Sequence, residues 1–115
     1  MSYKNLKLIR SIIAQVPGLT NHKDFDIAIE IGHHQRMGVP LTLKKLQLLN
    51  IATTATVRRH LGKMIAEGTV IKNTPASDRR TAHLTLNPKT MEALDRSLEK
   101  IHHTLCISMT QGRDD

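Results

Sequence analysis

The fold is decided by a stretch in the middle of the chain, LTLKKLQLLNIATTATVRRHLGKMIAEGTVIKN, residues 41–73. Thr42 is the predicted N-cap of a short helix over residues 43–49, because a threonine hydroxyl can accept a hydrogen bond from a free N–H of the first turn. Asn50 follows, and asparagine tolerates the left-handed conformation that a tight turn requires.

A second, longer helix is predicted after this turn. Either Thr53 or Thr54 can cap its start, and Gly68 stands where a helix commonly ends in a left-handed residue. Two helices joined by so short a connection, the second about four turns long, indicate a helix-turn-helix.

Two short strands are predicted to follow the second helix. The segments TVIKNT (69–74) and AHLTL (82–86) are rich in β-branched residues, and the turn-forming segment PASDRRT (75–81) separates them. A hairpin directly after a helix-turn-helix makes a winged helix, so the expected fold class is mostly α with a small β hairpin.

Further helices are predicted on both sides of the winged helix. Apolar residues at helical spacing indicate helices over residues 4–16, 24–37 and 89–105. We therefore expect one domain over residues 1–115, made of N-terminal helices (1–37), the helix-turn-helix and wing (41–86), a C-terminal helix (88–107) and a frayed tail (108–115).

The positive charge of the chain is concentrated in its middle. The formal net charge is +7, and residues 42–83 hold eight lysines and arginines against two acidic residues, a net charge of +6. Such a distribution favours a polyanionic partner, although a solvated basic face without a partner has the same composition. Tyr3 and Phe25 are the only aromatic residues. Readers of single strands depend on aromatic stacking, so duplex DNA is the better candidate.

Other bulk properties narrow the class of protein. No run of 18 uncharged apolar residues occurs, so no membrane-spanning segment is expected. The single cysteine, Cys106, excludes an internal disulfide and fits the reducing cytoplasm.

The second helix of the helix-turn-helix has two different faces at 100° per residue. The apolar face carries Val57, Leu61, Met64 and Ile65. The opposite face carries Thr56, Arg59 and Lys63, with Arg58 and His60 at its sides. An amphipathic helix with solvated cations would have the same pattern, but the preceding helix and the following hairpin favour a DNA reader.

Each polar residue of this helix has an expected role on DNA. The hydroxyls of Thr53, Thr54 and Thr56 lie near the helix start, where free N–H groups and the helix dipole favour phosphates. Arg59 suits a bidentate contact to guanine O6 and N7 in the major groove, and Lys63 is expected to contact a phosphate.

Residues 41–86 resemble a MarR-type winged-helix regulator. In that family the second helix ends in a pattern "L..L...G.I.R", and an Asp-x-Arg in the wing precedes a strand similar to "L.LT". The matching positions in this chain are Leu61, Met64, Gly68, Ile71, Asp78, Arg80, Leu84 and Leu86. Lys72 and Asn73 depart from the pattern, because they stand near a position where the family often has arginine.

The resemblance implies a mode of DNA binding. Thr56 and Arg59 would lie in the major groove, and Arg80 would reach the adjacent minor groove, with Arg79 next to a phosphate. Asp78 is expected to orient an arginine or cap the turn, since phosphate repels a carboxylate. The family commonly dimerises through its terminal helices, so the flanking helices of this chain are dimerisation candidates.

Other chemistry is not indicated by the sequence. The adjacent pairs His33–His34 and His102–His103 point about 100° apart on a helix, which is a poor geometry for a metal site. Cys106 is interpreted as a packed helix thiol, with a redox switch as the alternative. No motif for catalysis or for a cofactor is present, so we expect no enzyme, no metal and no cofactor.

The sequence thus predicts a homodimeric, cytoplasmic regulator of transcription that binds double-stranded DNA. Its expected DNA-binding residues are Thr42, Thr53, Thr54, Thr56, Arg58, Arg59, Lys63, Lys72, Arg79 and Arg80. The alternatives are a winged helix that binds another protein and an architectural protein that binds DNA without sequence preference.

Overall fold

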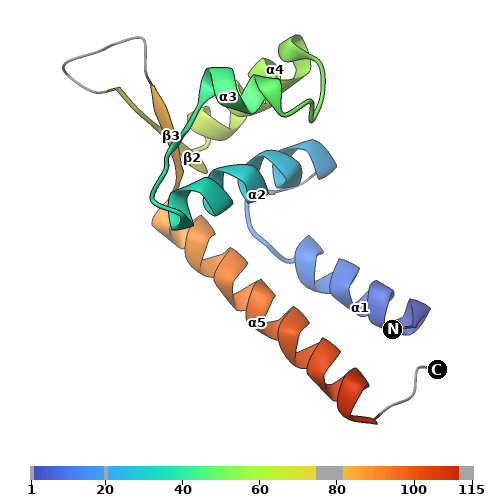
Figure 1. Cartoon of the computed structure of the whole chain (residues 1–115). Coiled ribbons are helices and arrows are strands. Elements are labelled where there is room, and N and C mark those ends of the chain that lie inside the picture. Colours follow the sequence, from blue (N-terminus) through green and yellow to red (C-terminus); the bar gives the residue numbers. More distant parts are fainter. Residues whose placement is uncertain (1, 20, 75–81, 112–115) are drawn as a thin grey trace. The chain divides into compact units, whose positions relative to one another are not determined.

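The computed structural model describes residues 2–19, 21–74 and 82–111, and the side chains of these residues up to 107. Its elements, in chain order, are α1 (Tyr3–Ala14), α2 (His22–Arg36), β1 (Leu41–Thr42), α3 (Leu43–Leu48), α4 (Thr54–Ala66), β2 (Val70–Asn73), β3 (His83–Leu86) and α5 (Pro88–Gln111) (Figure 1). They form two compact units, one of residues 18–88 and one of residues 1–17 with 89–115.

The unit of residues 18–88 is a winged helix. Its three-stranded antiparallel sheet has the order β1-β3-β2, with Leu41 opposite Leu84 and Val70 opposite Leu86. Helix α2 contacts α4 and β3 (Figure 1). The side chains that these elements bury together are Ile27, Ala28, Ile31, Leu41, Leu46, Val57, Leu61, Met64, Val70, Leu84 and Leu86. Mostly helical with a small sheet, the unit confirms the predicted fold class.

Local signals set the ends of the helix-turn-helix as predicted. The Thr42 hydroxyl caps α3 by accepting a hydrogen bond from Lys45 N at 3.2 Å, and Asn50 has φ +56° in the turn. Thr53 rather than Thr54 caps α4, and Gly68 beyond its end has φ +81°. The two-residue strand β1 was not predicted from the sequence, because two residues are too few to show the alternation of a strand.

Helix α2 connects the helix-turn-helix to the sheet. It begins at His22, two residues before its predicted start, because Asn21 is its N-cap and accepts a hydrogen bond from Asp24 N at 2.9 Å. Near its other end, Gln35 Oε1 accepts a hydrogen bond of 2.9 Å from Leu86 N in β3. The start of α2 is thus capped by Asn21, and its end is hydrogen-bonded to β3.

The unit of residues 1–17 and 89–115 consists of α1 and nearly all of α5. Ser2 caps α1 through a 3.4 Å hydrogen bond from Asn5 N, and none of the residues of α1 is buried. Helix α5 extends to Gln111, beyond its predicted end near residue 105. Several large apolar side chains of the two helices are exposed: Leu6, Leu8, Leu98 and Ile107.

None of the helices in the described part of the chain is long and apolar enough to span a bilayer.

The turn before α2 depends on a glycine, which provides a test of the fold. Gly18 has φ +81°, and an added Cβ would lie 2.9 Å from Thr69 Oγ1. We expect Gly18→Ala to lower the free energy of unfolding by at least about 1–2 kcal/mol, the cost of a left-handed alanine. Urea denaturation followed by circular dichroism measures the change.

The matched control is Gly62→Ala in α4, where an added Cβ meets no atom within 4 Å. Alanine favours a helix over glycine by about 0.5–1 kcal/mol, so this variant should be slightly more stable than the wild type. Equal denaturation midpoints for the two variants would contradict the described turn.

Candidate nucleic-acid interface

Helix α4 is held by its apolar side and exposes the other. Val57, Leu61 and Met64 are buried in the unit of residues 18–88, and Ile65 is half-buried. The exposed residues of the helix beyond its first position are Ala55, Arg58, Arg59, Gly62, Lys63 and Ala66. The predicted core face is thus confirmed, and the predicted cations lie outside it.

The exposed side of α4 is basic and sterically open. At 100° per residue Arg59 lies opposite the buried face, with Ala55 and Gly62 on one side of it and Thr56 and Lys63 on the other. Arg58 is exposed at the edge of this side. Because the side chains on one side of Arg59 are small, a flat or grooved partner can approach the helix backbone closely there. The sequence reasoning missed this feature, although the residue types show it.

Hydroxyl groups surround the N-terminus of α4. Thr53 Oγ1 accepts a hydrogen bond from Thr56 N at 3.2 Å and donates one of 2.9 Å to Thr56 Oγ1. The Thr56 hydroxyl keeps its own hydrogen as a donor, and Thr54 is exposed beside it. Free N–H groups and the positive end of the helix dipole also lie here, so this end of α4 suits an anion.

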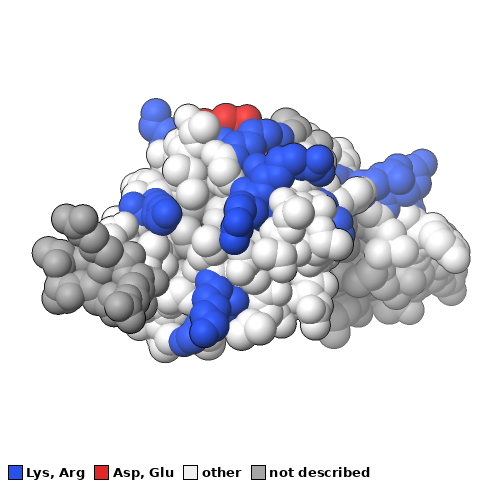
Figure 2. Space-filling model, turned by 90° about the horizontal axis from the view of Figure 1, so that it is seen from above, with Lys and Arg blue, Asp and Glu red and all other residues white. Residues whose placement is uncertain are grey.

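Further cations lie on the neighbouring elements of the same unit. Lys44 and Lys45 on α3 and Lys72 on β2 are exposed, while Glu67 follows the end of α4. The view from above in Figure 2 shows lysine and arginine side chains in several groups, with little acidic surface among them. A single sign of charge on one face is the electrostatic footprint of a polyanion-binding protein.

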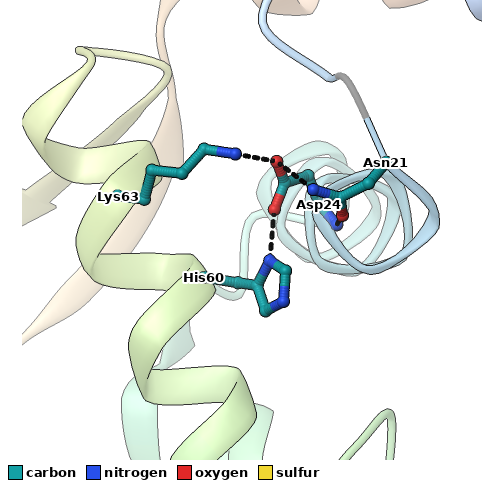
Figure 3. Close-up of polar contacts among 4 residues, drawn as sticks. All are labelled: Asn21, Asp24, His60 and Lys63. Atoms are coloured by element: carbon teal, nitrogen blue, oxygen red, sulfur yellow. Dashed lines mark hydrogen bonds and ion pairs between the residues drawn. The ribbon is translucent and has the colours of Figure 1, made fainter.

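Lys63 makes a contact that the sequence did not predict. Its Nζ lies 3.1 Å from Oδ2 of Asp24, a residue of α2 with 0% exposure, while the Lys63 side chain is 42% exposed. His60 approaches the same carboxylate from the preceding turn of α4, with 2.8 Å between His60 Nδ1 and Asp24 Oδ1 (Figure 3). Asn21 Nδ2 donates to Oδ2 at 3.2 Å. The polar side of α4 that faces α2 is thus attached to one buried carboxylate.

The turn of the helix-turn-helix is attached to α2 as well. Lys23 Nζ donates a 2.9 Å hydrogen bond to the carbonyl oxygen of Ile51. Lys23 and Asp24 are adjacent, so the first turn of α2 contacts both the α3–α4 turn and the middle of α4.

Of the remaining predicted DNA-binding residues, Thr42 and Lys72 are among the described residues and the wing residues are not. Thr42 is occupied as the N-cap of α3, and Lys72 lies on β2 beside Asn73, whose Nδ2 donates to Thr85 Oγ1 at 3.1 Å. The wing residues Asp78, Arg79 and Arg80 lie outside the described residues.

Asp24 could have been found from the sequence. An asparagine three residues before an acidic residue is close to the capping-box pattern of a helix start, and this spacing holds for Asn21 and Asp24. The partners of the carboxylate on α4 had no such local signal, because they are 36 and 39 residues away.

The histidines and the cysteine that were considered as metal or redox sites can be placed in the structure. Among the described residues, no group of three or more potential ligands could hold a metal ion. His34 Nδ1 lies 2.8 Å from the carbonyl oxygen of Glu30. The prediction of a packed thiol at Cys106 is wrong: it is exposed on α5, and its Sγ lies 3.4 Å from His102 Nε2.

The Asp24 contacts predict a large effect on stability. We expect Asp24→Ala to lower the free energy of unfolding by at least about 2 kcal/mol, because hydrogen bonds to charged groups contribute about 1.5–3 kcal/mol each. Chemical denaturation followed by circular dichroism measures the change.

Glu92 is the matched control, since its ion pair with Arg96 is exposed, with side-chain exposures of 68% and 62%. Glu92→Ala should change stability by less than about 0.5 kcal/mol, as expected for a surface pair. If both variants had the same small effect, the contacts of Asp24 would not stabilise the fold.

No protein-family model and no curated protein sequence matches the chain. Solved structures do match it. Staphylococcus aureus MepR, a transcription regulator of the multidrug efflux pump MepA, superposes with a TM-score of 0.70 at 14% identity over 95% of this chain and 76% of that chain. RV1404 from Mycobacterium tuberculosis gives a TM-score of 0.76 at 15% identity over 96% and 72% of the two chains.

A third match is S. aureus MarR, solved in complex with salicylate and kanamycin, with a TM-score of 0.69 at 21% identity over 97% of this chain and 70% of that chain. These likenesses extend over nearly the whole chain, and they confirm the resemblance noted in residues 41–86. The chain therefore has the winged-helix fold of the MarR-type regulators.

Proposed function

We propose that this protein is a homodimeric transcriptional regulator of the cytoplasm that binds double-stranded DNA in a sequence-specific manner. The observation that carries the proposal is the exposed side of α4, where Arg59 lies opposite a buried apolar face and beside the small residues Ala55 and Gly62. The fold supports it, because the matched structures include regulators of transcription.

The dimensions of α4 suit the major groove. A groove about 12 Å wide admits one α-helix, and a helix with alanine and glycine beside its central arginine can lie deep in it. Ala55 and Gly62 therefore bring Arg59 toward the base edges, where a guanidinium can donate to guanine O6 and N7. This would be the contact that reads sequence.

Other residues would contact the phosphates and fix the position of the protein on DNA. Thr54, Thr56 and the N-terminal N–H groups of α4 suit one phosphate, and Arg58 suits another. Thr53 contributes mainly as the cap of the helix, and Thr42 does the same for α3. Lys72 on β2 suits the backbone beside the wing.

The wing keeps the roles that the resemblance implies. Arg80 would enter the minor groove, Arg79 would contact a phosphate, and Asp78 would orient an arginine before DNA arrives.

The terminal helices support a dimer. Helix α1 has five leucines and isoleucines and buries none of them, and Leu98 on α5 is 63% exposed. Apolar surface of this kind is expected to be covered in the working protein. A two-fold dimer would place its two α4 helices in successive major grooves, which requires a pseudo-palindromic site with half-sites about 10 bp apart.

Sequence-specific binding is tested by selection from a pool of random DNA duplexes followed by sequencing. We expect the wild type to enrich a pseudo-palindromic motif that contains guanine. Arg59→Ala should lose the preference at one position of each half-site, because a bidentate contact contributes about 1–3 kcal/mol of base discrimination.

Arg58→Ala is the matched control, since this neighbouring arginine is exposed at the edge of the same helix side. It should weaken binding to all sequences and leave the motif unchanged. Enrichment of no motif by the wild type would indicate an architectural protein, and absence of binding at low salt would exclude DNA as the partner.

The dimer is tested by sedimentation velocity at micromolar concentration. We expect the wild type to sediment as a dimer and Leu98→Glu as a monomer, because the new charge would be buried in the interface. The control is Leu48→Glu, since Leu48 is 70% exposed but belongs to α3, which is part of the unit of residues 18–88. A monomeric wild type, or dissociation by both variants, would contradict this interface.

A further inference from the structure

A buried carboxylate next to the candidate DNA-reading helix has no part in the function proposed above. Asp24 has 0% exposure and accepts hydrogen bonds on both oxygens, from His60 on Oδ1 and from Lys63 and Asn21 on Oδ2 (Figure 3). A carboxylate only accepts, so His60 carries its hydrogen on Nδ1. Asp24 is also the third residue of α2, where the helix dipole favours negative charge.

The two contacts from α4 come from one side of that helix. His60 and Lys63 are three residues apart, so both side chains face α2. Two attachments to one carboxylate restrict the rotation of α4 about its axis. The 2.9 Å bond from Lys23 to Ile51 O holds the turn that precedes α4. The side of α4 that remains outward is therefore the side of Arg59.

The Lys63 side chain could pair either with Asp24 or with a DNA phosphate. Its side chain is 42% exposed, so its position on α4 would allow a phosphate contact. Lys63 is the only lysine or arginine among the described hydrogen-bonding partners of Asp24, which is fully buried. If Lys63 turned to a phosphate, the Asp24 carboxylate would lose this cationic partner. Removing a partner from a buried charge costs more than an exposed ion pair returns.

We propose that Asp24 is a positioning residue for DNA recognition, which fixes the rotation of α4 and withholds the charge of Lys63 from the phosphates. The proposal rests on the proposed DNA binding and deepens it. Lys63 is then a structural cation, and DNA binding at α4 depends on Arg58, Arg59 and the helix N-terminus. By limiting the number of phosphate contacts, Asp24 would lower affinity for DNA of any sequence and so raise the ratio of specific to non-specific binding.

The salt dependence of DNA binding measures this directly. Each phosphate contact contributes about 0.9 to the slope of log K against log salt concentration. The probe is a fluorescein-labelled 20-bp duplex of random sequence, titrated with wild type, Lys63→Gln, Asp24→Asn, the double variant and Arg58→Gln. Lys63→Gln keeps a hydrogen-bond donor toward Asp24, and Asp24→Asn turns an amide group toward Lys63.

We expect Lys63→Gln to leave the slope unchanged and Arg58→Gln to reduce it by about 0.9. Asp24→Asn should release Lys63 and make the slope steeper by about 0.9, and adding Lys63→Gln to it should remove that gain. A merely structural role of Asp24 would not steepen the slope. If Asp24→Asn fails to fold by circular dichroism, the comparison of Lys63→Gln with Arg58→Gln decides alone.

Equal reductions of the slope by Lys63→Gln and Arg58→Gln would overturn the proposal and leave the proposed DNA binding intact. Absence of wild-type binding to any duplex at low salt would instead overturn the proposed function, and this inference with it.

Discussion

The negative charge of Asp24 is the constraint on which the arrangement of the winged helix depends. A carboxylate with no exposure must have partners, and it has them on the helix that α2 packs against. Burial of Val57, Leu61 and Met64 sets which face of α4 turns inward. The polar contacts of Asp24 then fix the rotation of α4 more sharply than apolar packing alone, because hydrogen bonds are directional.

The properties of the outer face follow from that rotation. With the apolar residues turned inward and His60 and Lys63 directed at Asp24, the remaining outward residues are mainly arginines and small side chains. Attraction to phosphate, close approach to a groove and a group suited to guanine then occur on the same helix side. The exposed apolar residues of α1 and α5 lie in the other unit, and further exposed apolar residues, such as Leu48 on α3, lie in the unit of α4.

Much of the fold could be predicted because its signals are local. Thr42, Asn50, Thr53 and Gly68 act within a few residues of their own positions, and the structure confirms the ends that they mark. The buried face of α4 follows from helical spacing alone. The strand β1 was missed because its two residues pair with β3, more than 40 residues later in the chain.

The polar contacts of the candidate site could be predicted only in part. The sequence placed Arg59 correctly on the outer side of α4, but it gave no sign of the contact between Lys63 and Asp24. The contact with Asp24 joins residues 39 apart, and no helical pattern indicates which side of α4 faces α2. Cys106 was interpreted from the sequence as a packed thiol, whereas the cysteine is exposed on α5. Helical periodicity shows on which face of a helix a residue lies. The contacts that a polar residue makes depend on residues distant in the sequence, which periodicity does not identify.

The central claim is that the outer side of α4 reads DNA in the major groove. Protection of guanine N7 from methylation by dimethyl sulfate probes that groove directly, because N7 lies on the major-groove edge of guanine. With a duplex selected by the wild-type protein, we expect protection of guanines in two half-sites about 10 bp apart. Uniform methylation of a bound duplex, or protection of adenine N3 in the minor groove alone, would contradict the claim.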